Sequence, residues 1–258
     1  MARNVFTFDE VSFSYGRGNV FEKLDLGLRE GIVTTLVGAN GSGKSTLFNL
    51  MTKNLRPQAG RVFLRGGDVS ALRLRDFARF VAVVHQGNVA PSDVTVEKMV
   101  GYGRFPHRDA TRLASTEEDE RMVAWALDIC GLADLASARV ASLSGGQRQR
   151  VWIATALAQG TDVLLLDEPT TYLDVRFQLD VLRLVRDLNK RLGMTIVMVL
   201  HGINQAMHYS DEVVALAGGR VVAQGDAQSI ADPDLLHEVY GVELDVERVN
   251  GKPFVLTV

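Results

Sequence analysis

The chain contains 258 residues, of which 47% are hydrophobic and 23% charged, and its formal net charge is −3. This composition supplies a sizeable core and excludes wholesale disorder. It also lacks the strongly basic balance of a nucleic-acid-binding domain, so no nucleic acid is expected among the partners. Cys130 is the only cysteine, which excludes an intramolecular disulfide and a cysteine-based metal cluster, and we expect a buried free thiol there.

The first part of the chain alternates short strands with one helix. Residues 4–8 alternate in polarity and predict a half-exposed strand, whereas the apolar run 32–37 predicts a buried one. Residues 44–52 follow a glycine-rich turn and predict a helix. Residues 61–65 again alternate, so together with residues 4–8 they indicate an antiparallel flank. The apolar run 81–85 predicts another buried strand.

Strand signals are scarce between about Gly87 and Arg150, and this stretch predicts a helical insertion. Residues 117–130 show a clear amphipathic pattern that Gly131 ends. Residues 147–158 predict a further helix. The expected fold class is therefore α/β, with a mainly parallel sheet, an antiparallel β flank and an inserted α-helical subdomain.

The last part of the chain returns to the strand–helix alternation. Residues 162–166 and 195–200 predict buried strands on either side of a helix over residues 175–191. Residues 213–216 and 220–223 flank two glycines and predict a late hairpin. We expect the first part of the core in residues 1–86, the helical subdomain in residues 87–150 and the second part of the core in residues 151–258.

Residues 38–46 read Gly-Ala-Asn-Gly-Ser-Gly-Lys-Ser-Thr and fit the G-x-x-x-x-G-K-[ST] pattern between a strand and a helix. Glycines let the backbone present successive N–H groups to phosphate oxygens, and the following helix points its positive end at the anion. Lys44 would reach the β- and γ-phosphates, Ser45 would offer a hydroxyl to Mg²⁺, and Thr46 would donate to the α-phosphate. The residues expected to bind the phosphates of the ligand here are Asn40, Gly41, Ser42, Gly43, Lys44, Ser45 and Thr46.

The apolar strand 163–166 ends in two carboxylates, Asp167 and Glu168. Asp167 stands where it can hold Mg²⁺, and Glu168 is then placed to orient or activate an attacking water. An ordinary strand end with two solvated acids has the same short pattern. The phosphate loop in the same chain favours the catalytic interpretation.

A second candidate anion site precedes the helix predicted at residues 147–158. Residues 143–147 read Leu-Ser-Gly-Gly-Gln, in which Ser144 could cap the helix and the two glycines expose backbone N–H groups. One chain would then carry two half-sites for phosphate. The economical arrangement is a two-fold dimer in which each chain covers the other's nucleotide.

With these motifs the sequence resembles the ABC-type ATPase family across essentially its whole length, which implies a P-loop NTPase core. The resemblance implies that Tyr15 stacks on adenine and that Gln86 reaches Mg²⁺ and the water. It also implies that Asp174 contacts the opposite subunit and that His201 contacts the γ-phosphate. The implied catalytic residues are Lys44, Gln86, Glu168 and His201; the implied metal ligands are Ser45, Gln86 and Asp167; the second half-site comprises Ser144, Gly145, Gly146, Gln147 and Asp174.

Two positions depart from the family pattern. Ala39 stands where many members have proline, which should matter little because the glycines and Lys44 are present. Gly202 follows His201 where one branch often has aspartate, and this change would loosen the histidine loop.

Residues 101–108, 168–174 and 201–206 resemble one branch, the ATPase subunits of bacterial importers for ferric siderophores, haem and cobalamin. This resemblance implies a homodimer with ATP and Mg²⁺ that docks on transmembrane permease subunits and works indirectly with an extracytoplasmic substrate-binding protein. It would lie peripherally at the cytoplasmic face of the inner membrane. Residues from Gln86 to about His107 would line the permease groove, although the alternative interpretation of the basic residues of 101–108, Arg104 among them, is a solvated loop.

Three alternatives share parts of this pattern. One is a soluble ABC ATPase without a permease, such as one serving iron–sulfur cluster assembly, and another is an exporter subunit. DNA-repair and chromosome-organising ATPases carry long coiled coils, for which the interval from Ser45 to Ser144 is too short. No apolar run reaches the length of a spanning helix and residues 1–10 hold no apolar signal region, so we expect a cytosolic chain.

Overall fold

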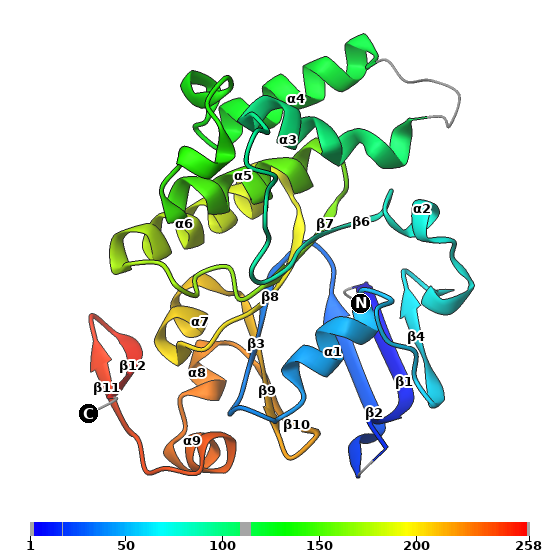
Figure 1. Cartoon of the computed structure of the whole chain (residues 1–258). Coiled ribbons are helices and arrows are strands. Elements are labelled where there is room, and N and C mark those ends of the chain that lie inside the picture. Colours follow the sequence, from blue (N-terminus) through cyan, green and yellow to red (C-terminus); the bar gives the residue numbers. More distant parts are fainter. Residues whose placement is uncertain (1–2, 17, 109–114, 257–258) are drawn as a thin grey trace. The chain divides into compact units, whose positions relative to one another are not determined.

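The computed structural model describes residues 3–16, 18–108 and 115–256. The chain forms two compact units, one from residues 1–72 with 189–258 and the other from residues 73–188. Figure 1 traces their elements along the chain. The expected α/β class is confirmed, since mainly parallel strands, an antiparallel sheet and a group of helices are all present. The three-part division at residues 86 and 150 stays a prediction.

The first unit contains an antiparallel sheet in the order β2-β1-β4-β5. Its inner face is apolar, with Phe6 and Phe8 almost completely buried. Bulges interrupt the two long strands, and Glu10 and Lys23 adopt positive φ values of 45° and 49°. The strand predicted over residues 4–8 therefore runs longer, and its partner β2 was not predicted. The bounds are β1 Asn4–Ser14, β2 Asn19–Arg29, β4 Ala59–Leu64 and β5 Gly67–Asp68.

The same unit contains four strands of a second sheet in the order β10-β9-β3-β8. The central strand β3 is buried at all five positions and runs parallel to both β8 and β9. The predicted late hairpin is confirmed as the antiparallel pair β9–β10. Parallel strands end at one edge of a sheet, so the segments after β3 and β8 emerge together. The bounds are β3 Val33–Val37, β8 Thr195–Val199, β9 Glu212–Ala217 and β10 Arg220–Gly225.

Helices and a C-terminal hairpin complete the first unit. Helix α1 is the one predicted after the glycine-rich turn. Helix α9 was not predicted, although Asp232 caps it, Pro233 opens it and Gly241 ends it at φ 73°. Helix α7 was also missed. The bounds are α1 Lys44–Met51, α7 Ile203–Tyr209, α8 Ala227–Ile230, α9 Pro233–Tyr240, the 3₁₀ turn η1 Val69–Ala71, and the hairpin β11 Asp245–Val249 with β12 Lys252–Leu256.

The second unit combines a parallel strand pair with packed helices. Strands β6 (Val81–Val84) and β7 (Val163–Asp167) pair from Val81 with Val163 to Val84 with Leu166. Helices α3, α4 and α5 pack against one another, as the green segments of Figure 1 show. Helix α6 begins here and continues to residue 192. The helical bounds are α2 Leu74–Phe77, α3 Val96–Gly101, η2 Tyr102–His107, α4 Glu117–Ile129, η3 Ala133–Leu135, η4 Val140–Ser142, α5 Gly145–Ala158 and α6 Val175–Leu192.

Arg104 ties three of these helical segments together. Its side chain is 4% exposed, its Nε lies 2.8 Å from Asp119 Oδ1, and its Nη1 donates to the carbonyl of Ala158. The solvated-loop interpretation is therefore wrong for Arg104. Burial opposes ionisation of Asp119, but hydrogen bonds from Arg104 and Thr116 outweigh it and hold the carboxyl pKa below its ordinary value.

Cys130 follows helix α4 and is buried, as the sequence predicted. Burial in apolar surroundings disfavours the thiolate and raises the pKa of Cys130 to about 12. The thiol is therefore protonated and unreactive in the folded protein. In the part of the chain that the structure describes, no helix combines the length and apolar character needed to cross a bilayer.

Candidate functional site

The glycine-rich loop lies between the end of β3 at Val37 and the start of α1 at Lys44. Gly38 and Gly43 have φ values of 149° and 109°, a region that favours glycine. Each is also packed closely. A Cβ on Gly38 would lie 2.3 Å from the carbonyl oxygen of Leu216, and one on Gly43 would lie 2.8 Å from the ring of Phe21. The loop conformation therefore requires both glycines.

Polar groups of this loop suit an anion. The Nζ of Lys44 donates to the carbonyl oxygens of Gly38 and Ala39 at 2.8 and 2.9 Å, which places the ammonium over the loop. Ser42 is buried, and its Oγ has no hydrogen-bond partner among the described residues. A buried hydroxyl without a partner costs free energy, and an oxygen-rich ligand would remove that cost. The loop and the N-terminus of α1 thus fit a phosphate group.

Tyr15 follows β1 and reaches this loop. Its hydroxyl shares a hydrogen bond of 3.3 Å with the hydroxyl of Thr46. Its ring packs edge-on against Phe13, with centroids 4.9 Å apart, and the residue is 65% exposed. An exposed ring that is fixed beside a phosphate loop can stack on the base of a nucleotide.

The carboxylates lie in the second unit, where β6 and β7 end at the same edge. The Nε2 of Gln86 donates to Glu168 Oε2 at 2.6 Å, although the two residues are 82 positions apart. Thr171 Oγ1 donates to the same oxygen at 3.0 Å. Glu168 has a φ of 49°, an uncommon backbone conformation that the surrounding structure must hold in place. The structure therefore brings Gln86 and Glu168 together and adds Thr171, for which no sequence pattern predicted a role in the site.

The serine of the Leu-Ser-Gly-Gly-Gln segment caps helix α5, as predicted. Ser144 Oγ accepts from the Gln147 N–H at 3.3 Å, and Gln147 Oε1 accepts from the Ser144 N–H at 3.0 Å. This reciprocal pair is a capping box. A Cβ on Gly146 would lie 2.3 Å from the ring of Phe177, so packing requires this glycine as well. The signal for the capping box was present in the sequence, where glutamine follows serine by three positions.

His201 is exposed at the carboxyl end of β8, next to β3 in the sheet. The backbone of Leu200 donates to the carbonyl of Leu36, which ties this end of β8 to β3. Gly202 then caps α7 with a φ of −80° and has no side chain for the first turn. Asp174, the remaining predicted residue, is exposed, and its carbonyl accepts from the Gln178 N–H at the start of α6.

The predicted residues thus form two local groups, each within one unit. The first unit offers an anion cradle, an exposed aromatic ring and a histidine at one sheet edge. The second unit offers a carboxylate held by an amide and a hydroxyl and, separately, a capped helix N-terminus. These groups suit phosphate binding and the orientation of a water for phosphoryl transfer, respectively.

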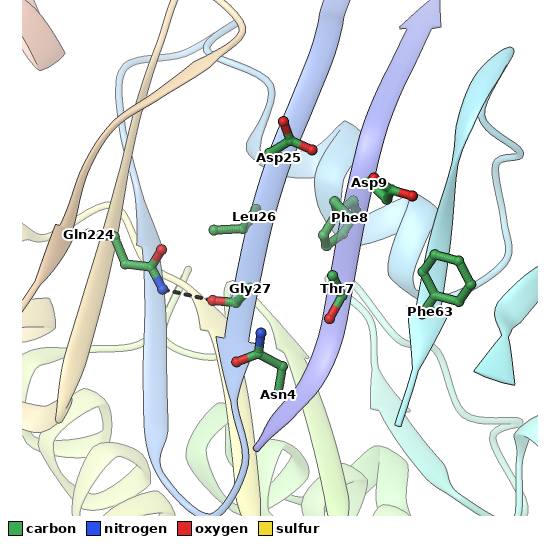
Figure 2. Close-up of a pocket in the computed structure, with 9 residues that line it drawn as sticks. All are labelled: Asn4, Thr7, Phe8, Asp9, Asp25, Leu26, Gly27, Phe63 and Gln224. Carbon is green, nitrogen blue, oxygen red and sulfur yellow. Dashed lines mark hydrogen bonds between the residues drawn. The ribbon is translucent and has the colours of Figure 1, made fainter. Parts of the chain in front are cut away.

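A groove of about 480 Å³ lies elsewhere in the first unit and is lined by residues of β1, β2 and β4 together with Gln224 of β10. Figure 2 shows residues of its lining, with Asp9 on β1, Phe63 on the neighbouring β4, Asp25 on β2, and the side chain of Gln224 donating to the carbonyl of Gly27. Glu10 N–H donates to Asp25 Oδ1 at 2.8 Å, so this carboxylate already stabilises the β1 bulge. None of the residues predicted for the site lines this groove.

Known proteins resemble the chain over most of its length. A family model described as ABC transporter matches residues 21–171. The iron(3+)-hydroxamate import ATP-binding protein FhuC of Bacillus subtilis (strain 168) is 42% identical over 256 residues, which cover 98% of this chain and 95% of that protein.

Solved structures show the same likeness. A chain described as part of a metal-chelate type ABC transporter in an inward-facing conformation gives a TM-score of 0.83 at 28% identity, covering 98% of this chain and 96% of that one. A dimeric ATP-binding cassette in a post-hydrolysis state, bound to ADP and Pi, gives a TM-score of 0.71 at 26% identity, covering 86% of this chain and 98% of that one.

Proposed function

Since the chain belongs to the ABC transporter family as an ATP-binding and ATP-hydrolysing member, we propose that it powers a membrane importer whose cargo is an iron-siderophore. The observation that carries the enzymatic part is the contact of Gln86 with Glu168 at the carboxyl edge of β6 and β7. The name and the 42% identity of the FhuC relative support the choice of cargo. Haem and cobalamin importers are the related alternatives.

The phosphate loop and Tyr15 would bind ATP. The loop N–H groups, the Lys44 ammonium and the unpartnered Ser42 hydroxyl would hold the phosphates, and the exposed Tyr15 ring would stack on adenine. Mg²⁺ prefers oxygen ligands and is usually held by one or two carboxylates together with substrate phosphates. Hydroxyl, amide and carboxylate oxygens suit it, and the residues that would hold it are Ser45, Gln86 and Asp167. When bound, the ion would neutralise charge on the phosphates.

Hydrolysis would depend on Glu168. Its Oε2 accepts hydrogen bonds from Gln86 and Thr171, which fix the direction of the carboxylate before substrate arrives. A fixed carboxylate can hold a water and accept its proton during in-line attack on the γ-phosphate. His201 would contact the γ-phosphate. Glu168 and His201 are thus the residues that would act on the reacting atoms.

Two copies would close over two nucleotides. The capped N-terminus of α5, with Ser144, Gly145, Gly146 and Gln147, would contact the nucleotide of the other copy, and Asp174 would contact the other subunit. Because these N–H groups would meet the phosphates only in the closed dimer, ATP would bind the closed state better than the open one and shift the population towards it. Hydrolysis would remove this contact and reopen the dimer.

A surface of the second unit suits a permease. Several large apolar side chains between residues 73 and 108 are exposed, and Phe105 stacks on Tyr102 with centroids 5.2 Å apart. Large exposed apolar side chains are typical of interaction sites. A cytoplasmic helix of the permease would cover them and hold the chain at the cytoplasmic face of the membrane, with a substrate-binding protein on the far side. The exposed side chains are Leu74, Phe80, Val89 and Phe105.

The test is co-purification of the tagged chain with host membranes in mild detergent, followed by mass spectrometry. We expect a stoichiometric polytopic permease with the wild-type protein and its loss with Val89→Asp, because a charge would enter the apolar surface. Val249→Asp is the matched control, since Val249 is an exposed valine of the C-terminal hairpin. Recovery with only soluble partners would overturn the importer and favour an ABC ATPase without a permease. The cargo is the compound, among iron-siderophore, haem and cobalamin, whose uptake is lost in cells lacking the gene.

A further inference from the structure

Two hydrogen bonds join Val255 of the C-terminal hairpin to helix α7 of the first unit. In the hairpin, Val246 pairs with Val255, and Val255 is completely buried. The N–H of Val255 donates to Asn204 Oδ1 and its carbonyl accepts from Asn204 Nδ2, both at 2.8 Å. In an antiparallel pair, residues whose N–H and C=O groups point outwards need a partner on that side. The Asn204 amide fulfils both needs, as a neighbouring strand would.

Asn204 also lies at a position that matters for the predicted site. It is the second residue of α7, a helix of only seven residues, and it follows the exposed His201 by three positions. The N-cap of α7 is Gly202, which has no side chain to satisfy the N–H groups of the first turn. Short helices without a cap fray at their ends. The two hydrogen bonds of Asn204 hold the turn that follows His201.

We propose that Asn204 is a positioning residue for His201 and that the C-terminal hairpin serves as its anchor. By fixing the first turn of α7 to Val255, Asn204 sets where the peptide from His201 to Ile203 lies and therefore where the imidazole can reach. This inference rests on the proposed function, in which His201 contacts the γ-phosphate. Asn204 itself touches no reacting atom.

The remaining contacts of α7 explain why this anchor acts on position more than on folding. Ile203, Ala206 and Met207 are buried on the apolar side of the helix, so hydrophobic packing keeps α7 on the unit. Packing of this kind is non-directional and tolerates small shifts. The paired hydrogen bonds of Asn204 are directional and define the orientation of the first turn. Loss of the anchor would shift His201 while leaving the helix in place.

The experiment compares the full-length wild type with Asn204→Ala, using MgATP for turnover and ATP without Mg²⁺ for binding. Misplacing a catalytic group by about 1 Å can cost up to a hundredfold, and we expect kcat to fall roughly tenfold. The Kd for ATP should stay within about twofold, because the phosphate loop and Tyr15 are untouched. Asn204→Asp keeps the acceptor for the Val255 N–H but turns a carboxylate oxygen towards the Val255 carbonyl, so its kcat should fall at least as far as that of Asn204→Ala. Arg248→Ala is the control, since it removes a hairpin contact to Gln228 of α8 and none to α7.

A double-mutant cycle separates positioning from a purely structural role. If Asn204 acts through His201, adding Asn204→Ala to His201→Ala should lower kcat no further. Wild-type kcat in Asn204→Ala, or an equal tenfold loss in both backgrounds, would overturn the inference. Wild-type kcat in His201→Ala would instead overturn the role of His201 in the proposed function, and the inference with it. Thermal unfolding of each variant gives the folded fraction by which kcat is corrected.

Discussion

The phosphate loop of the first unit is held by its neighbours in the chain, whereas the carboxylate edge of the second unit is held by residues that lie far apart. Lys44 donates to carbonyls five and six positions earlier. Glu168 accepts from Gln86, which precedes it by 82 positions. The phosphate loop is formed by a local backbone conformation, which glycines and one short helix set. The carboxylate edge is formed when β6 pairs with β7.

The two parts of the site are therefore sensitive to different changes. A local motif survives as long as its own backbone can adopt the required angles. A site assembled by strand pairing also depends on every tie that keeps its unit together. We therefore expect the largest losses from long-range ties, and smaller ones from local positions.

Arg104→Ala should have the largest effect on stability. The change removes the closer of the two guanidinium groups beside the buried carboxylate of Asp119, leaving Arg108 at 3.9 Å, and it removes a bond to Ala158. Breaking a buried pair in this way costs about 3–5 kcal/mol. Denaturant unfolding would measure the loss. The surface pair Arg73–Asp76 is the control, since Arg73→Ala should cost less than about 1 kcal/mol. A small loss at Arg104 would contradict the importance of this tie.

The same tie predicts a response to acid. The folded state holds the pKa of Asp119 below the ordinary value of 3.8, so its contribution to stability is complete above that pH and is lost as the pH falls below it. The free energy of unfolding of Asp119→Asn should therefore fall less on acidification than that of the wild type, although the variant is less stable than the wild type at neutral pH. Unfolding curves between about pH 2 and pH 7 would show this. An equal loss of stability at low pH in the wild type and in Asp119→Asn would contradict the contribution of Asp119.

Gly38→Ala should cause the next largest loss, because the new Cβ would clash with the Leu216 carbonyl in a backbone conformation that favours glycine. The strain alone is worth about 1–2 kcal/mol, or about tenfold in ATP affinity. Gly41→Ala is the matched control. Gly41 has a φ of 82°, but its Cβ would meet nothing within 4 Å among the described residues. Equal losses of ATP affinity in the two variants would show that packing against Leu216 is unimportant.

Tyr15→Ala should weaken ATP binding by about 1 kcal/mol, close to fivefold, because the adenine would lose its stacking partner. Tyr15→Phe keeps the ring and loses only the 3.3 Å hydrogen bond to Thr46, so its affinity should stay near that of the wild type. Titration with ATP would measure both. Equal losses of ATP affinity in the two variants would show that the hydroxyl of Tyr15, and not its ring, contributes to binding.

Gly202→Asp should have the smallest effect and should be stabilising. The position has φ −80° and ψ 108°, which aspartate adopts readily, and a carboxylate there could accept from the first-turn N–H groups of α7. Aspartate exceeds glycine as an N-cap by a few tenths of a kcal/mol, roughly. The nearest atoms to a new Cβ belong to the Gln205 side chain at 3.3–3.5 Å, which can move. Thermal unfolding would detect the gain, and a decrease would contradict the cap geometry.

Local signals explain why much of the core was predictable. The phosphate loop, the capping serine of α5 and the buried strands β3, β6, β7 and β8 each carry their signal within a few residues. Bulges at Glu10 and Lys23 break the two-residue period of β1 and β2, so one strand was predicted too short and the other was missed. Helix α7 has a glycine cap and only seven residues, which leaves no start signal.

Long-range contacts explain the rest. Nothing around Arg104 in the sequence reveals that Asp119 will bury its charge, because the two meet only after η2 packs against α4. Thr171 likewise acquires its role only once Glu168 turns back at a φ of 49°. The Asn204 anchor joins positions 51 residues apart. Such contacts depend on how the elements pack in the folded chain, and short patterns within the sequence do not reveal that packing.

The most direct measurement determines ATP affinity and kcat side by side for Lys44→Ala and Glu168→Gln. Lys44→Ala should lose at least about tenfold in affinity, because a charge-assisted contact to phosphate disappears. Glu168→Gln should bind ATP like the wild type and lose about 10²- to 10⁴-fold in kcat, because an amide cannot accept the proton of the water. Our account separates a loop that binds ATP from a carboxylate edge that hydrolyses it. Wild-type turnover in Glu168→Gln would contradict this account, as would a loss of ATP affinity as large as that of Lys44→Ala.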